Sequence, residues 1–253
     1  MSVITLNNIK KKYGLTEVLE DFSMTINDKE KIGLIGPNGS GKTTIFKIIS
    51  GIESYEQGTV AIRNKTSIGY LSQMPDMRKN NNLYEELLTV FAEVIELKDK
   101  ISSVEKRISR LGQEESEDGS NGELESLMKK YSKIQEEFEE KGGYSYESEI
   151  KKVAVGLGFE LEELNKKVSA LSGGEKTRLG LVKLLLSKPD LLLLDEPSNH
   201  LDIPSIQWLE NYLNDYGGAV VIISHDRYFL DHVVDRIVEI KHGSEEIYQG
   251  NYS

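Results

Sequence analysis

One glycine-rich segment of this chain has the residue types and spacing to hold phosphate groups. It runs Gly36-Pro37-Asn38-Gly39-Ser40-Gly41-Lys42-Thr43-Thr44 and fits the pattern G-x-x-x-x-G-K-[ST] of phosphate-binding loops. Its glycines let backbone N–H groups point inward around a β-phosphate, at the N-terminus of the following helix. Lys42 would reach the β- and γ-phosphates, and the Thr43 hydroxyl would coordinate Mg²⁺. The segment therefore predicts a nucleoside triphosphate site built from Gly36, Asn38, Gly39, Ser40, Gly41, Lys42, Thr43 and Thr44.

A pair of acidic residues, Asp195 and Glu196, follows the apolar run Leu191–Leu194. Such a run predicts a strand buried on both faces of a parallel sheet, and ligands of open α/β sheets bind beyond the carboxyl ends of the strands. At that place Asp195 fits a magnesium-binding role, and Glu196 fits the general base that orients an attacking water. Paired acids at a strand end can also cap the next element. The four leucines before them and Pro197 after them favour the chemical role.

A second glycine-rich turn lies between these two motifs, in Leu171-Ser172-Gly173-Gly174-Glu175-Lys176-Thr177-Arg178. The order of phosphate loop, Leu-Ser-Gly-Gly and then Leu-Asp-Glu-Pro resembles the ATP-binding cassette ATPases. The spellings LSGGEKTR and LDEPSNHLD look like the ABC-F branch, whose members act on ribosomes rather than on membranes. The ending Gly250-Asn251-Tyr252-Ser253 is similar to the segment that introduces the linker to a second cassette in that branch. We therefore expect the N-terminal cassette of a two-cassette protein.

The resemblance implies roles for three residues whose types alone would not assign them. Gln73 matches the Q-loop glutamine, which contacts Mg²⁺ and the attacking water, and Tyr13 matches the aromatic residue that stacks on adenine. His225 matches the switch histidine, which contacts the γ-phosphate. A lone histidine is more often structural, and an aromatic residue near a first strand is often part of the core. The resemblance thus implies ATP and Mg²⁺ as ligands, with Glu196, His225 and Gln73 as catalytic residues and Thr43, Gln73 and Asp195 around the metal.

The resemblance also implies a site shared between two cassettes. In cassette proteins the Ser-Gly-Gly turn starts a helix whose positive end faces the γ-phosphate bound to the opposite domain. Ser172 and Gly174 would therefore act on the partner's nucleotide, and Asp202 would lie at the same junction. The expected partner is a second cassette in the same full-length chain, or another copy of this fragment.

The elements around these motifs predict an α/β protein with a P-loop (RecA-like) ATP-binding cassette core and an antiparallel β subdomain. Apolar or alternating runs predict strands at Val3–Ile9, Phe22–Ile26, Lys31–Ile35, Thr59–Ile62, Ile68–Leu71, Asp190–Asp195 and Ala219–Ser224. Helices are expected from the phosphate loop to Gly51 and around Ile206–Leu213. The predicted core spans 1–75 and 176–253, and a helical subdomain spans 76–175.

The middle of the chain has the apolar spacing of a coiled coil. From Leu83 to Leu111 the apolar steps alternate four and three, which predicts a helix of 29 residues, about 43 Å long. A polar stretch, Gly112–Gly122, should break it, and the spacing resumes from Leu124 to Phe138. We expect the helical subdomain to be extended by an antiparallel coiled-coil arm at about 94–141. The alternative, ordinary core helices, is preferred for Leu83–Val94.

Charge complicates the expected contact with ribosomal or transfer RNA. The chain has a net charge of −11, and residues 93–141 hold 14 acidic and 9 basic side chains, so the arm is net −5. RNA binding favours basic surfaces, but the expected tip carries Glu114, Glu115, Glu117 and Asp118. Any RNA contact is therefore predicted on the first helix of the arm, at Lys98, Lys100, Lys106, Arg107 and Arg110.

Composition narrows the class of protein. The chain has no cysteine, no apolar run near the length of a transmembrane helix and no recognisable secretory signal, which favours a cytoplasmic location. The leading hypothesis is an ATP-driven factor of translation, with a housekeeping or an antibiotic-protection role left open. The alternative is the ATPase subunit of an ABC membrane transporter. A DNA-maintenance ATPase would need a far longer coiled coil.

Overall fold

A six-stranded sheet with one antiparallel edge strand forms the centre of the molecule. The computed structural model describes residues 1–71, 77–111, 120–241 and 243–250. The strand order is β5-β6-β7-β3-β8-β9, in which every neighbouring pair is parallel except β8 and β9. The strands are β3 (Lys31–Ile35), β5 (Ile68–Tyr70), β6 (Leu191–Asp195), β7 (Ala219–Ile223), β8 (Arg236–Lys241) and β9 (Ser244–Gln249). The last two were not predicted from the sequence.

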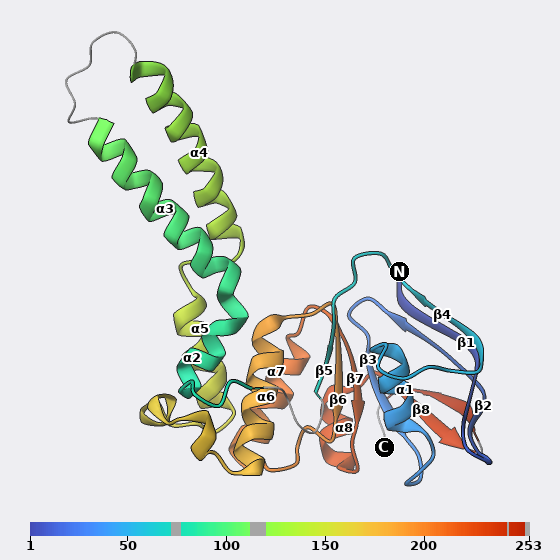
Figure 1. The fold of residues 1–253 in the computed structure, drawn as a ribbon. Coiled ribbons are helices and arrows are strands. Elements are labelled where there is room, and N and C mark those ends of the chain that lie inside the picture. The colour runs from blue at the N-terminus through green and yellow to red at the C-terminus, as the bar shows by residue number, and fades with distance from the viewer. Residues whose placement is uncertain (72–76, 112–119, 242, 251–253) are drawn as a thin grey trace.

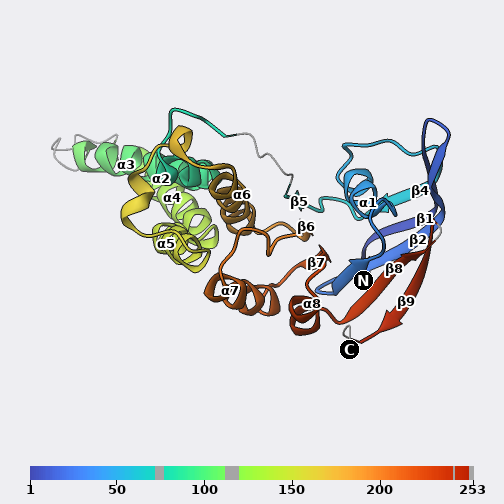
Figure 2. The same ribbon diagram turned by 90° about the horizontal axis from the view of Figure 1, so that it is seen from below.

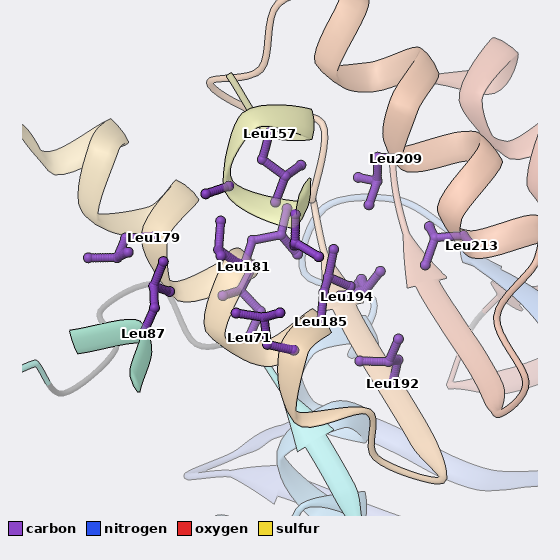
Figure 3. Packing of buried hydrophobic residues seen from close by; sticks show 14 of the residues in the cluster. Leu71, Leu87, Leu157, Leu179, Leu181, Leu185, Leu192, Leu194, Leu209 and Leu213 are labelled. Carbon is purple, nitrogen blue, oxygen red and sulfur yellow. The ribbon is translucent and has the colours of Figure 1, made fainter. Parts of the chain in front are cut away.

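Side chains of the central strands alternate between the two faces of the sheet, so the hydrophobic core has two layers. Leu192 and Leu194 of β6 pack with the helices on one face, and Leu191 and Leu193 pack on the other face. Figure 3 shows Leu181 and Leu185 gathered with Leu194 on the helical side. The four leucines of β6 are buried, because a strand in the middle of a covered sheet has no face left for water.

An antiparallel sheet covers the second face of the core. Its order is β2-β1-β4, with β1 at Ser2–Tyr13, β2 at Thr16–Asn27 and β4 at Gln57–Ile62. The helix α1 (Lys42–Ile49) lies between the two sheets (Figure 2) and buries Phe46 there. This confirms the expected combination of an α/β cassette core with an antiparallel β subdomain.

Helices cover the first face of the six-stranded sheet and build the helical subdomain beside it (Figures 1 and 2). They are α2 (Leu83–Leu88), α3 (Ala92–Leu111), α4 (Ser120–Glu140), α5 (Tyr146–Gly156), α6 (Gly173–Ser187), α7 (Ile203–Asn214) and α8 (Arg227–Val233). Short 3-10 turns lie at Thr89–Phe91, Glu162–Asn165 and Val168–Ala170. The division at 75 and 176 stays a prediction.

The expectation of one 29-residue helix from Leu83 was wrong, because the 3-10 turn Thr89–Phe91 divides it into α2 and α3. The Thr89 hydroxyl donates to the Glu86 carbonyl at 2.6 Å, and the Thr89 N–H donates to the same carbonyl. These bonds tighten the chain, and Phe91 is buried in the body of the protein. The remaining α3 has 20 residues, so it is about 30 Å long.

The helices α3 and α4 pair as a hairpin that projects from the body (Figure 1). Val104 and Phe138 are buried, and Arg107 pairs with Glu123 at 2.6 Å while Lys141 pairs with Glu93 at 2.6 Å. The expected break at Gly112–Gly122 ends too late, because α4 already begins at Ser120 and includes Gly122. Gly122 is the third residue of α4, so it lies in the first turn and not in the helix interior, where a glycine costs about 1 kcal/mol. Coiled-coil packing of this hairpin stays a prediction, and its acidic tip lies outside the described residues.

Candidate functional site

The carboxyl ends of three neighbouring parallel strands converge on the phosphate loop. The loop follows Ile35 of β3, Glu196 follows β6, and His225 comes shortly after β7. Since these strands are adjacent in the order β6-β7-β3, residues far apart in the sequence meet at one edge of the sheet.

The phosphate loop has the backbone conformation that its glycines allow. The φ angles of Gly36, Gly39 and Gly41 are 147°, 81° and 100°, in the region that side chains rarely adopt. A Cβ atom at Gly36 would also lie 2.8 Å from the Ile240 carbonyl oxygen. Among the described residues no side chain caps the N-terminus of α1, which begins at Lys42. Its first N–H groups are therefore available to an anion.

The Lys42 ammonium folds back across its own loop. Its Nζ donates to the carbonyl oxygens of Gly36 at 2.8 Å and of Pro37 at 2.9 Å. The residue is buried, and this burial lowers the pKa of Lys42 against the opposite effect of the Glu196 and Asp195 carboxylates. Phosphate oxygens could therefore replace the two carbonyls without bringing Lys42 out of the protein.

Thr43 and Asp195 form the part of the site that suits a metal. The Thr43 hydroxyl donates to Asp195 Oδ2 at 2.8 Å, so two hard oxygen donors lie side by side. Mg²⁺ prefers such oxygens, and it is usually held by one or two protein groups together with substrate phosphates. Across the four described stretches, no group of three or more His, Asp and Glu residues could hold a metal without such help. Gln73 lies outside the described residues.

Glu196 and His225 form an acid–imidazole pair beside the loop. Glu196 has a left-handed φ of 51°, and its N–H donates to the Ile223 carbonyl at 2.8 Å. Its Oε2 accepts the His225 N–H at 3.4 Å, and its Oε1 lies 3.6 Å from His225 Nε2. Oε1 is buried and has no hydrogen-bond partner among the described residues. Burial raises the pKa of Glu196, with the His225 N–H acting in the opposite direction.

A cavity of about 490 Å³ joins most of the predicted nucleotide residues. Its lining includes ten of them: Tyr13, Asn38, Gly39, Gly41, Lys42, Thr43, Thr44, Asp195, Glu196 and His225. Gly36 lines an adjoining hollow of about 290 Å³ together with Lys42 and His225. Ser40 lines neither, and its hydroxyl is buried without a partner in the described part of the chain. Val18 and Ile223 were missed, because apolar strand residues carry no signal that separates cavity lining from core.

The Ser-Gly-Gly turn is built at the start of a different helix. Ser172 caps α6: its Oγ accepts the Glu175 N–H at 3.3 Å, and Glu175 Oε2 accepts the Ser172 N–H at 2.7 Å. Lys166 pairs with the same carboxylate at 2.7 Å, and this bond, together with the hydrogen bonds from Ser172, lowers the pKa of Glu175 to about 2. Neither Ser172 nor Gly174 lines the nucleotide cavity. Asp202 also serves as a cap, since its Oδ1 accepts the Ser205 N–H at 3.0 Å at the start of α7.

Comparison with known proteins identifies the family of the chain. Residues 19–199 match the family model described as ABC transporter. The chain is 44% identical over 253 residues to YdiF of Bacillus subtilis, covering 100% of this chain and 38% of that protein. It is 38% identical over 256 residues to ABC transporter F family member 5 of Arabidopsis thaliana, covering 100% of this chain and 36% of that protein.

The energy-dependent translational throttle protein EttA of Mycobacterium tuberculosis is 34% identical over 251 residues, covering 99% of this chain and 43% of that protein. Thus the chain spans less than half the length of these relatives. A dimeric ATP-binding cassette in a post-hydrolysis state with ADP and Pi shares the fold, with a TM-score of 0.64 at 19% identity, covering 97% of this chain and 98% of that one. No helix in the described ranges is long and apolar enough to cross a membrane. The chain therefore belongs to the ABC transporter family, and its relatives include a protein named as a member of the F family.

Proposed function

We propose that this cassette binds Mg·ATP in the 490 Å³ cavity and hydrolyses it together with a second cassette of the same full-length protein. The observation that carries the proposal is the juxtaposition of Lys42, the Thr43–Asp195 pair and the Glu196 carboxylate along one cavity, with Glu196 Oε1 accepting no hydrogen bond from the described residues. These groups are the ones required to hold a triphosphate, a magnesium ion and an attacking water.

The phosphate loop and Lys42 would bind the phosphates of ATP. The uncapped N–H groups at the start of α1 would hold the β-phosphate, and Lys42 would exchange its two loop carbonyls for β- and γ-phosphate oxygens. Tyr13, which is 45% exposed beside the loop, offers a ring on which adenine can stack. When bound, Mg²⁺ would neutralise phosphate charge next to Thr43 and Asp195, and Gln73 is proposed for the same group.

Glu196 would activate the attacking water. Its Oε1, which has no hydrogen-bond partner among the described residues, would accept the proton as the water oxygen bonds to the γ-phosphorus and the bond to the β-phosphate bridging oxygen breaks. His225, close to the same oxygen, would hold the carboxylate and contact the γ-phosphate. Ser172 and Gly174, which lie away from this cavity, would complete the site of the opposite cassette.

The ribosome is the partner that we propose for the full-length protein. Support comes from the name of the relative EttA, a translational throttle protein, and from the projecting α3–α4 hairpin (Figure 1). Of the five basic residues expected to meet RNA, Lys98, Lys100 and Arg107 are paired with acids of this chain. Within the described residues Lys106 and Arg110 have no acidic partner, and they line a hollow of about 570 Å³ on α3.

Co-sedimentation with ribosomes tests both parts of this proposal. The full-length protein carrying Glu196→Gln and the equivalent change in its second cassette should pellet with ribosomes in ATP and not in ADP. Adding Lys106→Glu and Arg110→Glu should weaken pelleting, whereas Lys129→Glu and Lys130→Glu on α4 serve as the matched control. Failure to pellet while ATP is bound would refute the ribosome as partner and favour the ATPase subunit of a membrane transporter. Unchanged pelleting of the Lys106/Arg110 variant would exclude this flank as the RNA contact.

A further inference from the structure

The ring of Tyr13 is attached to the body of the protein by a buried lysine. Lys11 and Tyr13 are two residues apart on β1 and therefore share one face of the strand. The Lys11 Nζ lies over the Tyr13 ring, 5.1 Å from its centroid. Lys11 is only 5% exposed and does not line the nucleotide cavity, although Tyr13 does.

Two carboxylates hold the Lys11 ammonium in this place. Its Nζ pairs with Glu53 Oε1 at 3.0 Å and with Glu56 Oε1 at 3.6 Å. The hydrogen bond to Glu53 raises the pKa of Lys11, and the same bond lowers the pKa of Glu53, so both groups are charged at neutral pH. A charged lysine with these partners gains little by turning toward solvent.

Glu53 is in turn anchored through its backbone to the end of the phosphate-loop helix, and Glu56 is anchored to β1. The Glu53 N–H donates to the carbonyl of Lys47, in the last turn of α1, at 3.1 Å. The Glu56 N–H donates to the Lys10 carbonyl at 2.9 Å, and Glu56 Oε2 accepts the Lys12 N–H at 3.1 Å. A chain of polar contacts therefore joins the Tyr13 ring to the helix that begins at the phosphate loop.

We propose that Lys11 is a positioning residue for nucleotide binding, which holds the Tyr13 ring from behind so that a base can stack on the face open to the cavity. This inference rests on the stacking role proposed for Tyr13. A cation attracts the face of an aromatic ring, so the ring keeps one orientation without a contact between Lys11 and the nucleotide. The Tyr13 ring that stacks on the base and the loop that binds the phosphates are then held at a fixed separation, because both are connected to α1.

Binding of ATP and of inorganic tripolyphosphate distinguishes this role from simple support of the fold. The probe protein is the full-length chain whose second cassette carries the equivalent of Lys42→Ala, so that only this site binds. Tyr13→Ala should raise the Kd for ATP about tenfold, since a stacked base contributes that much or more. Lys11→Met should raise it about three- to tenfold, the range of a partly buried cation–aromatic contact. Neither change should alter the Kd for tripolyphosphate.

Coupling between the two residues gives the decisive result. In a Tyr13→Ala background, Lys11→Met should not raise the Kd for ATP any further. In the natural background, Lys11→Arg should bind ATP with the affinity of the natural protein. The control is Lys12→Met, because Lys12 is exposed and pairs with Glu17 at 3.0 Å. If Lys11→Met fails to fold, Glu53→Gln tests the same chain of contacts.

The outcomes separate this inference from the proposal on which it rests. The positioning role would be overturned if Lys11→Met weakened the binding of ATP and of tripolyphosphate equally. It would also be overturned if Lys11→Met raised the Kd for ATP by the same factor in the Tyr13→Ala background as in the natural background. An unchanged Kd for ATP in Tyr13→Ala would instead refute the stacking role of Tyr13 itself, and the inference with it.

Discussion

Replacing Glu196 with glutamine should remove hydrolysis and leave ATP binding intact. The amide has the size of the carboxyl group, and among the described residues Oε2 of the carboxylate accepts one long bond, from the His225 N–H at 3.4 Å. The exchange therefore loses little ground-state contact, and we expect the Kd for ATP to change by less than about threefold, the range of one weak hydrogen bond. Base catalysis contributes about 10²–10⁴-fold, which corresponds to about 2.7–5.4 kcal/mol of activation free energy.

The same substitution should stabilise the folded protein at neutral pH. Burial raises the pKa of Glu196, so the folded state disfavours the charged carboxylate relative to the unfolded state. The stability linked to this group is present below its unfolded pKa and is lost as the pH rises through its folded pKa. A neutral amide avoids that loss, so the midpoint of urea unfolding at pH 7 should rise slightly.

Single-turnover hydrolysis of ATP by the full-length protein, with the second cassette disabled by the equivalent substitution, measures the first effect. Equilibrium binding and urea unfolding of the same sample measure the other two. A Glu196→Gln protein that hydrolyses ATP at the natural rate would refute the role of this carboxylate as base. A matching loss of ATP affinity would show that Glu196 holds the nucleotide instead, and lower stability at pH 7 would contradict the argument from burial.

Three further predictions address binding and stability. Lys42→Ala should abolish ATP binding, measured by equilibrium titration, with thermal unfolding retained as the check on folding. Glu175→Gln should destabilise the protein by about 1–3 kcal/mol above pH 5, because the pKa of Glu175 is lowered to about 2 beside Lys166. That difference should vanish as the pH falls toward 2, in urea unfolding at several pH values, and a pH-independent difference would contradict it. Glu86→Ala should cost about 3–5 kcal/mol in urea unfolding, because the Lys183 ammonium loses a buried partner. A double variant that also carries Lys183→Met should recover part of that loss.

The sequence predicts those parts of the site that are set by local chemistry and strand order. Glycines at 36, 39 and 41 require left-handed backbone angles, which the structure has, and a buried leucine run must bring Asp195 to the edge of a sheet. Thr43 and Asp195 could be expected to meet because parallel strands end together, and they lie 2.8 Å apart. The functional roles of these residues stay predictions.

Features that depend on tertiary packing could not be predicted in the same way. The heptad spacing from Leu83 to Leu111 runs through the 3-10 turn without a break, because hydrophobic period alone does not record where a helix leaves the protein body. Strand β9 is mostly exposed and rich in polar residues, so its sequence has no apolar pattern that predicts a strand. Backbone pairing with β8 holds it in the sheet instead. Lys11 gave no signal either, since a charged residue in a strand ordinarily faces water.

The placement of the Ser-Gly-Gly turn bears on the proposal that two cassettes share each nucleotide site. The capping box of Ser172 and Glu175 holds the start of α6, and Lys166 neutralises the carboxylate that would otherwise repel an incoming phosphate. Such a terminus is suited to an anion, but the cavity beside Lys42 does not include it. Two cassettes arranged head to tail would bring each α6 terminus to the other's phosphate loop, so closure should require nucleotide on both. A full-length protein with Ser172→Ala should therefore lose hydrolysis at the second cassette's site while its own cavity still binds ATP. Loss of binding at its own cavity would place Ser172 within one cassette and refute the shared site.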